Sequence, residues 1–289
     1  MADPLFPLKQ LNPELTAQYV SLQFLDVFPG QSTDFIPELL THVEALFAGK
    51  KGNYLPLDTK YHDLEHTLQA TACLTHLLTN YQRSQVEPPL TPFEFELALT
   101  AIVLHDTGYL KETKDHVGTG AKYTHIHEFR SCQHAQEWLK TRDWAPEHAQ
   151  AIKHLILSTG PKSKLDTIAF QNPKERLLGF CVCTADFISQ MADPSYPRKL
   201  PHLYSEFEES FEFIGLGVPE RPYNSAEDLL QTTPYFWENF VLPRLQIECE
   251  NVLQFLADPV TGKNVYLEQI EENIRLIASS IPQIKARCN

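Results

Sequence analysis

The segment spanning residues 93–104 is apolar around most of its circumference when it is drawn as a helix. A helix that is hydrophobic on all sides is normally buried, with other elements packed around it. Thr91, Pro92 and Glu94 form a capping box with proline at the first helical position, which marks the start of this helix. The sequence therefore predicts a core that is built around a central helix over about 92–106.

The rest of the chain favours an all-α protein. Glycine is scarce at 11 residues in 289, and most of the 21 prolines lie between apolar segments with helical periodicity. No repeat and no long polar linker divides the chain, so we expect residues 1–289 to form a single domain. The segments expected to be helical are 13–28, 35–51, 61–83, 92–106, 126–142, 146–158, 173–188, 203–214, 226–257 (with a break near Pro234 or Pro243) and 264–281.

Two carboxylates fall in apolar surroundings. Asp106 follows His105 directly at the end of the central helix, and Asp186 lies inside segment 173–188, which is also apolar nearly all round. Burying an unpaired carboxylate costs several kcal/mol, so each of these side chains needs a cation or a hydrogen-bond donor as a partner. The alternative for the His105–Asp106 pair is a helix end that frays into water.

A second pair of histidines adds to this pattern. His62 and His66 are four residues apart, and in a helix over 61–83 they would share one face. Such a pair can share a metal ion, or one imidazole can bind the ion while the other acts as an acid or base. Histidines and aspartates that converge from three core helices suggest a divalent ion, with zinc, manganese, iron and magnesium as candidates.

The overall charge excludes some partners. The formal net charge of −13 argues against binding to a nucleic acid polymer or to an anionic membrane surface. A small phosphorylated substrate stays compatible, because a metal ion supplies local positive charge. No apolar run approaches the roughly 20 residues that span a bilayer. The six cysteines include no C-x-x-C pair, which suggests reduced thiols and a cytoplasmic protein.

Three short motifs carry a resemblance to a known family. In chain order they are Tyr61-His62-Asp63-x-x-His66, His105-Asp106-x-Gly108-Tyr109 and Thr184-Ala185-Asp186. This order resembles the HD superfamily of metal-dependent phosphohydrolases. It is most similar to the branch that contains the cyclic nucleotide phosphodiesterases, whose first motif reads Tyr-His-Asn-x-x-His.

The resemblance implies an HD-domain helical bundle with additional C-terminal helices, in which one or two divalent ions are held by His66, His105, Asp106 and Asp186. It also implies that His62 stays outside the ligand set and protonates the leaving oxygen while a metal-activated water attacks phosphorus. The implied organisation is a metal-site core at about 60–190, a helical lead-in at 1–59 and a C-terminal extension at 195–289.

Some positions depart from the phosphodiesterase pattern. Asp63 replaces the asparagine, and Tyr109 stands where the phosphodiesterases carry a further histidine, which leaves the number of ions open. Segment 125–131 resembles a His/Asn-Glu-x-x-Ser segment of some bacterial HD proteins. There Glu128 would face the metal site as a base, as a ligand of a second ion or as a partner of a ligand. The alternative is an acid that favours the first turn of a helix.

We therefore expect a metal-dependent phosphohydrolase, of phosphodiesterase or nucleotidase type, that acts on a small nucleotide. A homo-oligomer is compatible with this expectation. One alternative is a di-iron oxygenase of the HD fold, which would need further ligands from His125, His127 or His154; the first two are read instead as residues that flank a loop. Another alternative is a non-catalytic module that binds a nucleotide. Four basic residues are read as solvated, although they could meet a phosphate at the mouth of the site: Lys162, Lys164, Arg198 and Lys199.

Overall fold

A computed structural model describes residues 11–142 and 144–287, with 281–287 as backbone only. The first ten residues of the predicted lead-in and Cys288 lie outside this part of the chain. The described residues form no strand, and Tyr54 and Glu112 make one isolated antiparallel bridge. The prediction of an all-α protein is confirmed.

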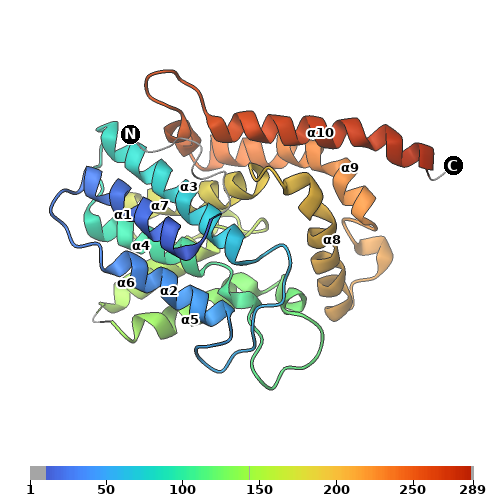
Figure 1. Cartoon of the computed structure of the whole chain (residues 1–289), viewed down its shortest axis with the longest axis horizontal. Helices are drawn as coiled ribbons and strands as arrows, with labels where there is room; N and C mark the ends of the chain where they lie inside the picture. The colour runs from blue at the N-terminus through green and yellow to red at the C-terminus, as the bar shows by residue number, and fades with distance from the viewer. Residues whose placement is uncertain (1–10, 143, 288–289) are drawn as a thin grey trace.

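Figure 1 shows the arrangement of the helices, with α8, α9 and α10 together on one side of the bundle. None of the described helices is long and apolar enough to cross a membrane. The α-helices are α1 (Pro13–Val27), α2 (Phe35–Phe47), α3 (Leu64–Arg83), α4 (Pro92–Leu104), α5 (His127–Leu139), α6 (Pro146–Leu157), α7 (Pro173–Met191), α8 (Tyr196–Phe213), α9 (Ala226–Phe236) and α10 (Val265–Arg287). The shorter turns are η2 (Thr107–Tyr109), η3 (Gly120–Tyr123), η4 (Leu165–Thr167), η5 (Val218–Glu220), η6 (Trp237–Val241), η7 (Arg244–Glu248) and η8 (Val252–Leu256).

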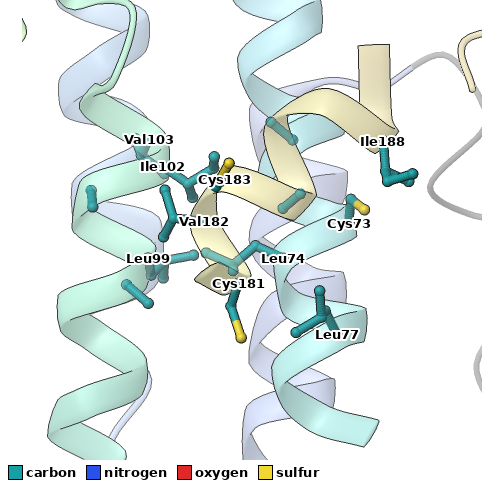
Figure 2. Close-up of a cluster of buried hydrophobic side chains, with 14 of the residues drawn as sticks. Cys73, Leu74, Leu77, Leu99, Ile102, Val103, Cys181, Val182, Cys183 and Ile188 are labelled. Atoms are coloured by element: carbon teal, nitrogen blue, oxygen red, sulfur yellow. The ribbon is translucent and has the colours of Figure 1, made fainter. Parts of the chain in front are cut away.

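The centre of the core lies where α3, α4 and α7 meet. Leu74 of α3, Ile102 of α4 and Val182 of α7 are all fully buried, and Figure 2 shows them together. The predicted capping box is present, since the Thr91 hydroxyl accepts from the Glu94 amide and the Glu94 carboxylate accepts from the Thr91 amide. The central helix α4 therefore ends at a fixed place in the core, directly before His105.

The start of α3 differs from the prediction, and the difference bears on the site. The helix begins at Leu64 because the Asp63 carboxylate accepts a hydrogen bond from the His66 amide at 2.9 Å and caps it. His62 therefore precedes the helix, and the prediction that His62 and His66 share a helix face is wrong. His62 reaches the site from the loop instead.

The boundaries of several other helices also differ from the predicted ones. Helix α8 begins at Tyr196 rather than near residue 203: Pro197 lies in its first turn, where proline is tolerated, and Pro201 lies inside the helix. Helix α2 ends at Phe47, earlier than predicted. The break or kink expected in 226–257 is a change of helix type: α9 ends at Phe236, the π-helical turns η6 and η7 follow on either side of Pro243, and the backbone stays helical to Glu248.

Candidate metal centre

Four side-chain atoms from three helical segments converge on one point. His105 Nε2 lies 3.3 Å from Asp106 Oδ2 and 3.3 Å from Asp186 Oδ1. His66 Nε2 lies 3.3 Å and 3.2 Å from the same two oxygens, and 3.3 Å from His105 Nε2. Ligands held 2.0–2.2 Å from a tetrahedral ion are roughly 3.3–3.6 Å apart, so the spacing of the His66, His105 and Asp106 atoms suits one ion, and these three residues form a group of mutually close ligand atoms. Asp186 Oδ1 lies beside the two imidazole nitrogens.

The elements of the core fix these side chains. His66 lies in the first turn of α3, the adjacent His105 and Asp106 follow α4, and Asp186 lies in the middle of α7. All four residues are buried, with Asp186 the most exposed at 8%. Asp106 Oδ2 is buried and has no hydrogen-bond partner. A buried carboxylate oxygen without a donor is costly, so the geometry favours a cation beside it.

Hydrogen bonding at the far side of the His105 ring sets its tautomer. His105 Nδ1 lies 2.7 Å from the Ile102 carbonyl oxygen, to which it donates its proton. The lone pair of Nε2 then points toward the four-atom cluster. An imidazole held in this way by a carbonyl is the arrangement that metal-binding histidines usually show.

Charges within the cluster shift its pKa values in opposite directions. Burial disfavours the charged form of His66, but Asp106 and Asp186 outweigh that effect and raise its pKa to about 10. Burial would raise the pKa of both carboxyls, but the two histidines hold it below the usual range in each. The cluster therefore binds positive charge, which a divalent ion could supply in place of protons.

Helix α5 holds the loop that carries Asp106. The Ser131 hydroxyl accepts from the Gly108 amide at 2.8 Å and donates to the His105 carbonyl. Arg130 donates to the carbonyls of Gly108 and Leu110 at 2.7 and 2.6 Å. A β-carbon at Gly108 would lie 1.9 Å from a carbonyl oxygen of α5, so glycine permits this close approach. These contacts explain why a serine follows Glu128 at this spacing.

The same close approach brings His127 to the site. His127 directly follows the loop, as predicted, and is the first residue of α5; its Nε2 lies 3.7 Å from Asp106 Oδ1. His127 Nδ1 donates to the Thr124 carbonyl at 2.7 Å, so the Nε2 lone pair faces the carboxylate. Its neighbour His125 points elsewhere, with its ring 6.2 Å from that of Phe213.

His62 lies beside the cluster and is held from outside it. Its Nδ1 lies 2.6 Å from Glu206 Oε2 of α8, and Glu206 Oε1 accepts from the amides of Lys60 and Tyr61 at 2.7 Å each. Burial alone would lower the pKa of His62, but the Glu206 carboxylate raises it above its ordinary value. Glu206 did not emerge from the sequence, because it is 144 residues away in the chain.

Tyr109 packs against two of these imidazoles. Its ring stacks on His62 with centroids 4.6 Å apart and on His127 with centroids 4.7 Å apart, and the planes tilt by 16° and 19°. Tyr109 is 1% exposed. The residue that replaces the histidine of the phosphodiesterases is therefore a buried ring that packs against both imidazoles, whose own centroids are 6.2 Å apart.

Glu128 lies next to His127 rather than next to the four clustered ligand atoms. Glu128 Oε2 is 3.5 Å from His127 Nδ1, and its other oxygen lies against Gly160, where a β-carbon would be 2.6 Å from it. No recorded hydrogen bond or ion pair among the described residues joins Glu128 to the four converging atoms. Its place is thus beside His127, between the cluster and the loop after α6.

The other candidates are placed away from the cluster. His154, a possible extra iron ligand, has its Nδ1 2.5 Å from Glu175 Oε1. Of the three histidines that a di-iron oxygenase would need, the structure brings only His127 to the site. Lys199 pairs with Glu65 at 3.2 Å and with Asp193 at 2.7 Å, so its charge is already matched.

Comparison with solved structures finds phosphodiesterase folds. One is the phosphodiesterase domain of the RhoPDE fusion protein from the choanoflagellate Salpingoeca rosetta, with a TM-score of 0.64, 16% identity, and coverage of 98% of this chain and 96% of that chain. Another is the phosphodiesterase domain of Salpingoeca rosetta rhodopsin phosphodiesterase, with a TM-score of 0.62, 17% identity, and coverage of 97% and 92%. At such identities the likeness shows the fold alone.

A search of curated proteins finds no match to this sequence. A family profile described as Npun_R2479-like matches residues 119–278, a stretch that includes Glu128, Asp186 and Glu206 but begins after the His105–Asp106 pair. Since this stretch covers more than half of the chain, the protein belongs to the Npun_R2479-like family.

Proposed function

We propose that this protein is a metal-dependent phosphohydrolase of the HD superfamily that acts on a small phosphorylated substrate of nucleotide type. The observation that carries the proposal is a cluster of ligand atoms within the fold of a phosphodiesterase domain: the Nε2 atoms of His66 and His105 lie 3.3 Å apart, and each lies 3.2–3.3 Å from one oxygen of Asp106 and one of Asp186. His66, His105, Asp106 and Asp186 would hold the ion. Nitrogen and oxygen ligands of this kind suit zinc, manganese, iron or magnesium.

The residues present fit an ion on two counts. Asp106 Oδ2 is buried without a hydrogen-bond donor, and the His105 Nε2 lone pair points at the same place. A divalent ion there would neutralise charge on the phosphoryl oxygens and make a water acidic enough to attack near neutral pH. The remaining work falls to the side chains around it.

His62 is the proposed proton donor to the leaving oxygen. Glu206 accepts a hydrogen bond from His62 Nδ1, which favours the protonated ring and leaves Nε2 to face the substrate. Tyr109 stacks on the ring and limits its rotation. His62 is therefore oriented from two sides, as a general acid must be if the proton is to arrive when the phosphoester bond breaks.

His127 is the residue that could support a second ion. Its Nε2 and Asp106 Oδ1 face each other at 3.7 Å, on the side of the Asp106 carboxylate opposite to the first cluster. Asp106 and His127 would hold that ion, which would supply further positive charge for the attacking and leaving oxygens, as in two-metal sites. The Thr124 carbonyl orients that ring, and Glu128 is proposed to add negative charge beside it, since its carboxylate lies 3.5 Å from Nδ1.

We also infer that residues 1–289 act as one domain, with the site in the core segment of about 60–190. The support is one buried apolar cluster, which takes members from α1, α4, α7 and α10 (Val20, Ile102, Val182 and Ile270 among them). In this view the C-terminal extension is part of the site, because Glu206 of α8 positions His62.

The test is hydrolysis of a set of phosphoesters, including bis-p-nitrophenyl phosphate and cyclic and linear nucleotides, under several divalent metals. We expect turnover with at least one metal and a loss of about 10³-fold or more in Asp106→Ala. Glu112→Ala, at an exposed carboxylate outside the site, is the matched control and should keep full activity. Turnover that persists in Asp106→Ala would contradict the proposal, and tight nucleotide binding without turnover would favour a non-catalytic module.

A further inference from the structure

A cleft of about 300 Å³ lies outside the metal centre. Helices α5 and α6 and the loop that joins α6 to α7 form its walls, and Phe129, Lys153, Ser163 and Lys164 are among its lining residues. Phe129 follows Glu128 directly on α5. The Glu128 carboxylate lies against Gly160 of the loop, so it stands between this cleft and His127.

The charge of the cleft is opposite to that of the whole protein. The sequence has 37 acidic and 24 basic residues, yet the cleft is lined by two lysines and by no aspartate or glutamate. Within the described residues, neither Lys153 nor Lys164 has an ion-pair partner, whereas Lys111, Lys122 and Lys199 each pair with a carboxylate. Two unpaired ammonium groups in one concavity attract an anion.

The cleft also offers a flat apolar surface. Phe129 is 61% exposed, and it lines the cleft beside Leu157 and Ile168. An exposed aromatic ring next to cationic side chains suits a ligand that carries both an aromatic ring and a negative charge, because the ring gains a stacking partner and loses apolar contact with water.

The loop that carries Ser163 and Lys164 is fixed from behind. Arg244 is 4% exposed, and its guanidinium donates to the Ser163 carbonyl at 2.9 Å and to the carbonyls of Ser158 and Gly160 at 3.4 and 3.3 Å. The floor of the cleft is also preset, since the buried His154 ring is held at 2.5 Å by Glu175 and at 2.6 Å by Gln150. A preformed cleft binds without the cost of ordering a loop.

From these observations we propose that this cleft is a binding site for an organic phosphate with an aromatic ring, the chemistry of a nucleoside monophosphate. The ring packs on Phe129, and the phosphate lies between Lys153 and Lys164 with Ser163 as a further donor. The site is separate from the four converging ligands and requires no metal. Its occupant is either a distinct effector or the distal part of the substrate.

The probes are adenosine 5′-monophosphate and inorganic phosphate, titrated by calorimetry into the full-length protein in EDTA. We expect wild type to bind the nucleotide, and Lys153→Glu and Lys164→Glu each to weaken binding by about tenfold or more. Phe129→Ala should weaken binding of the nucleotide but leave inorganic phosphate unchanged. Lys162→Glu is the matched control, because it changes the same charge on the same loop outside the cleft, and it should change affinity less than about twofold.

Two results would overturn the proposal: no nucleotide binding to wild type, or an equal loss in Lys162→Glu and Lys164→Glu. Because binding is measured without metal, its outcome is independent of whether the metal centre hydrolyses phosphoesters. Kinetics then separate the two sources of the ligand. A raised KM with little change in kcat in Lys164→Glu identifies the distal part of the substrate, and an unchanged KM identifies an effector.

Discussion

Replacing Ser131 with alanine should loosen the loop that carries Asp106 while leaving every proposed metal ligand in place. The Ser131 hydroxyl is fully buried and joins two backbone groups of that loop, the Gly108 amide at 2.8 Å and the His105 carbonyl. Alanine removes both bonds, and no water can easily reach the groups that are left.

The expected cost follows from those two bonds. An amide left buried without an acceptor costs about 1–3 kcal/mol, and the lost net bond to the carbonyl adds about 0.5–1.5 kcal/mol. The free energy of unfolding should therefore fall by about 1.5–4.5 kcal/mol. Since Asp106 follows His105 directly, metal affinity should also fall by about 10–100-fold, as it does when groups that orient metal ligands are removed.

Urea unfolding followed by circular dichroism in EDTA measures the stability change, and competition with a metal-binding dye measures affinity. Thr75→Val is the matched control, since it removes a fully buried hydroxyl that donates only to the Thr71 carbonyl within α3, at 2.8 Å. The control should cost at most about 1.5 kcal/mol and leave metal affinity unchanged. Equal effects in the two variants, or unaltered metal affinity in Ser131→Ala, would refute the argument that α5 positions the loop.

Three further predictions rest on other contacts. Glu206→Gln should lower kcat by at least about tenfold with little change in metal content, because His62 loses the partner that orients it; Glu209→Gln, one turn along α8, should keep kcat. Gly108→Ala should abolish metal binding or folding, because its β-carbon would lie 1.9 Å from a backbone oxygen, as metal analysis and circular dichroism would show. Burial lowers the pKa of His134 from 6.5 to about 4, so the unfolded chain takes up this proton first as the pH falls. His134 alone should therefore contribute a decline in stability of about 3 kcal/mol between about pH 6.5 and 4, so the decline should be smaller by that amount in His134→Gln than in wild type when urea unfolding is repeated across that range.

Much of the fold could be predicted because local signals decide it. The capping box at Thr91 and the all-round apolar pattern after it correctly identified the central helix, and both can be seen within a few residues of sequence. The start of α3 was predicted too early although a signal was present: an aspartate at position 63 is a common helix cap. A helix that is capped by Asp63 leaves His62 in the loop before it.

The four proposed ligands could be grouped from the sequence through the order and spacing of their motifs. The residues that contact them from other elements could not be predicted in this way. His127 reaches Asp106 because the backbone at Gly108 touches the start of α5, and that contact depends on tertiary packing. Glu206 reaches His62 across 144 residues, from a helix whose sequence pattern is that of an ordinary amphipathic segment. A residue that contacts a site from a distant helix has no recognisable pattern in the sequence around it.

The most direct test of the account is the metal content of the purified protein and of its Asp186→Asn variant, measured by elemental analysis after dialysis against each candidate metal. Asp186 supplies one of the four converging atoms, and asparagine keeps its shape but loses its charge. We predict at least about one ion per chain in wild type and about a tenth of that or less in the variant. Equal metal content in the two proteins, or none in wild type, would contradict the claim that these residues form a metal centre.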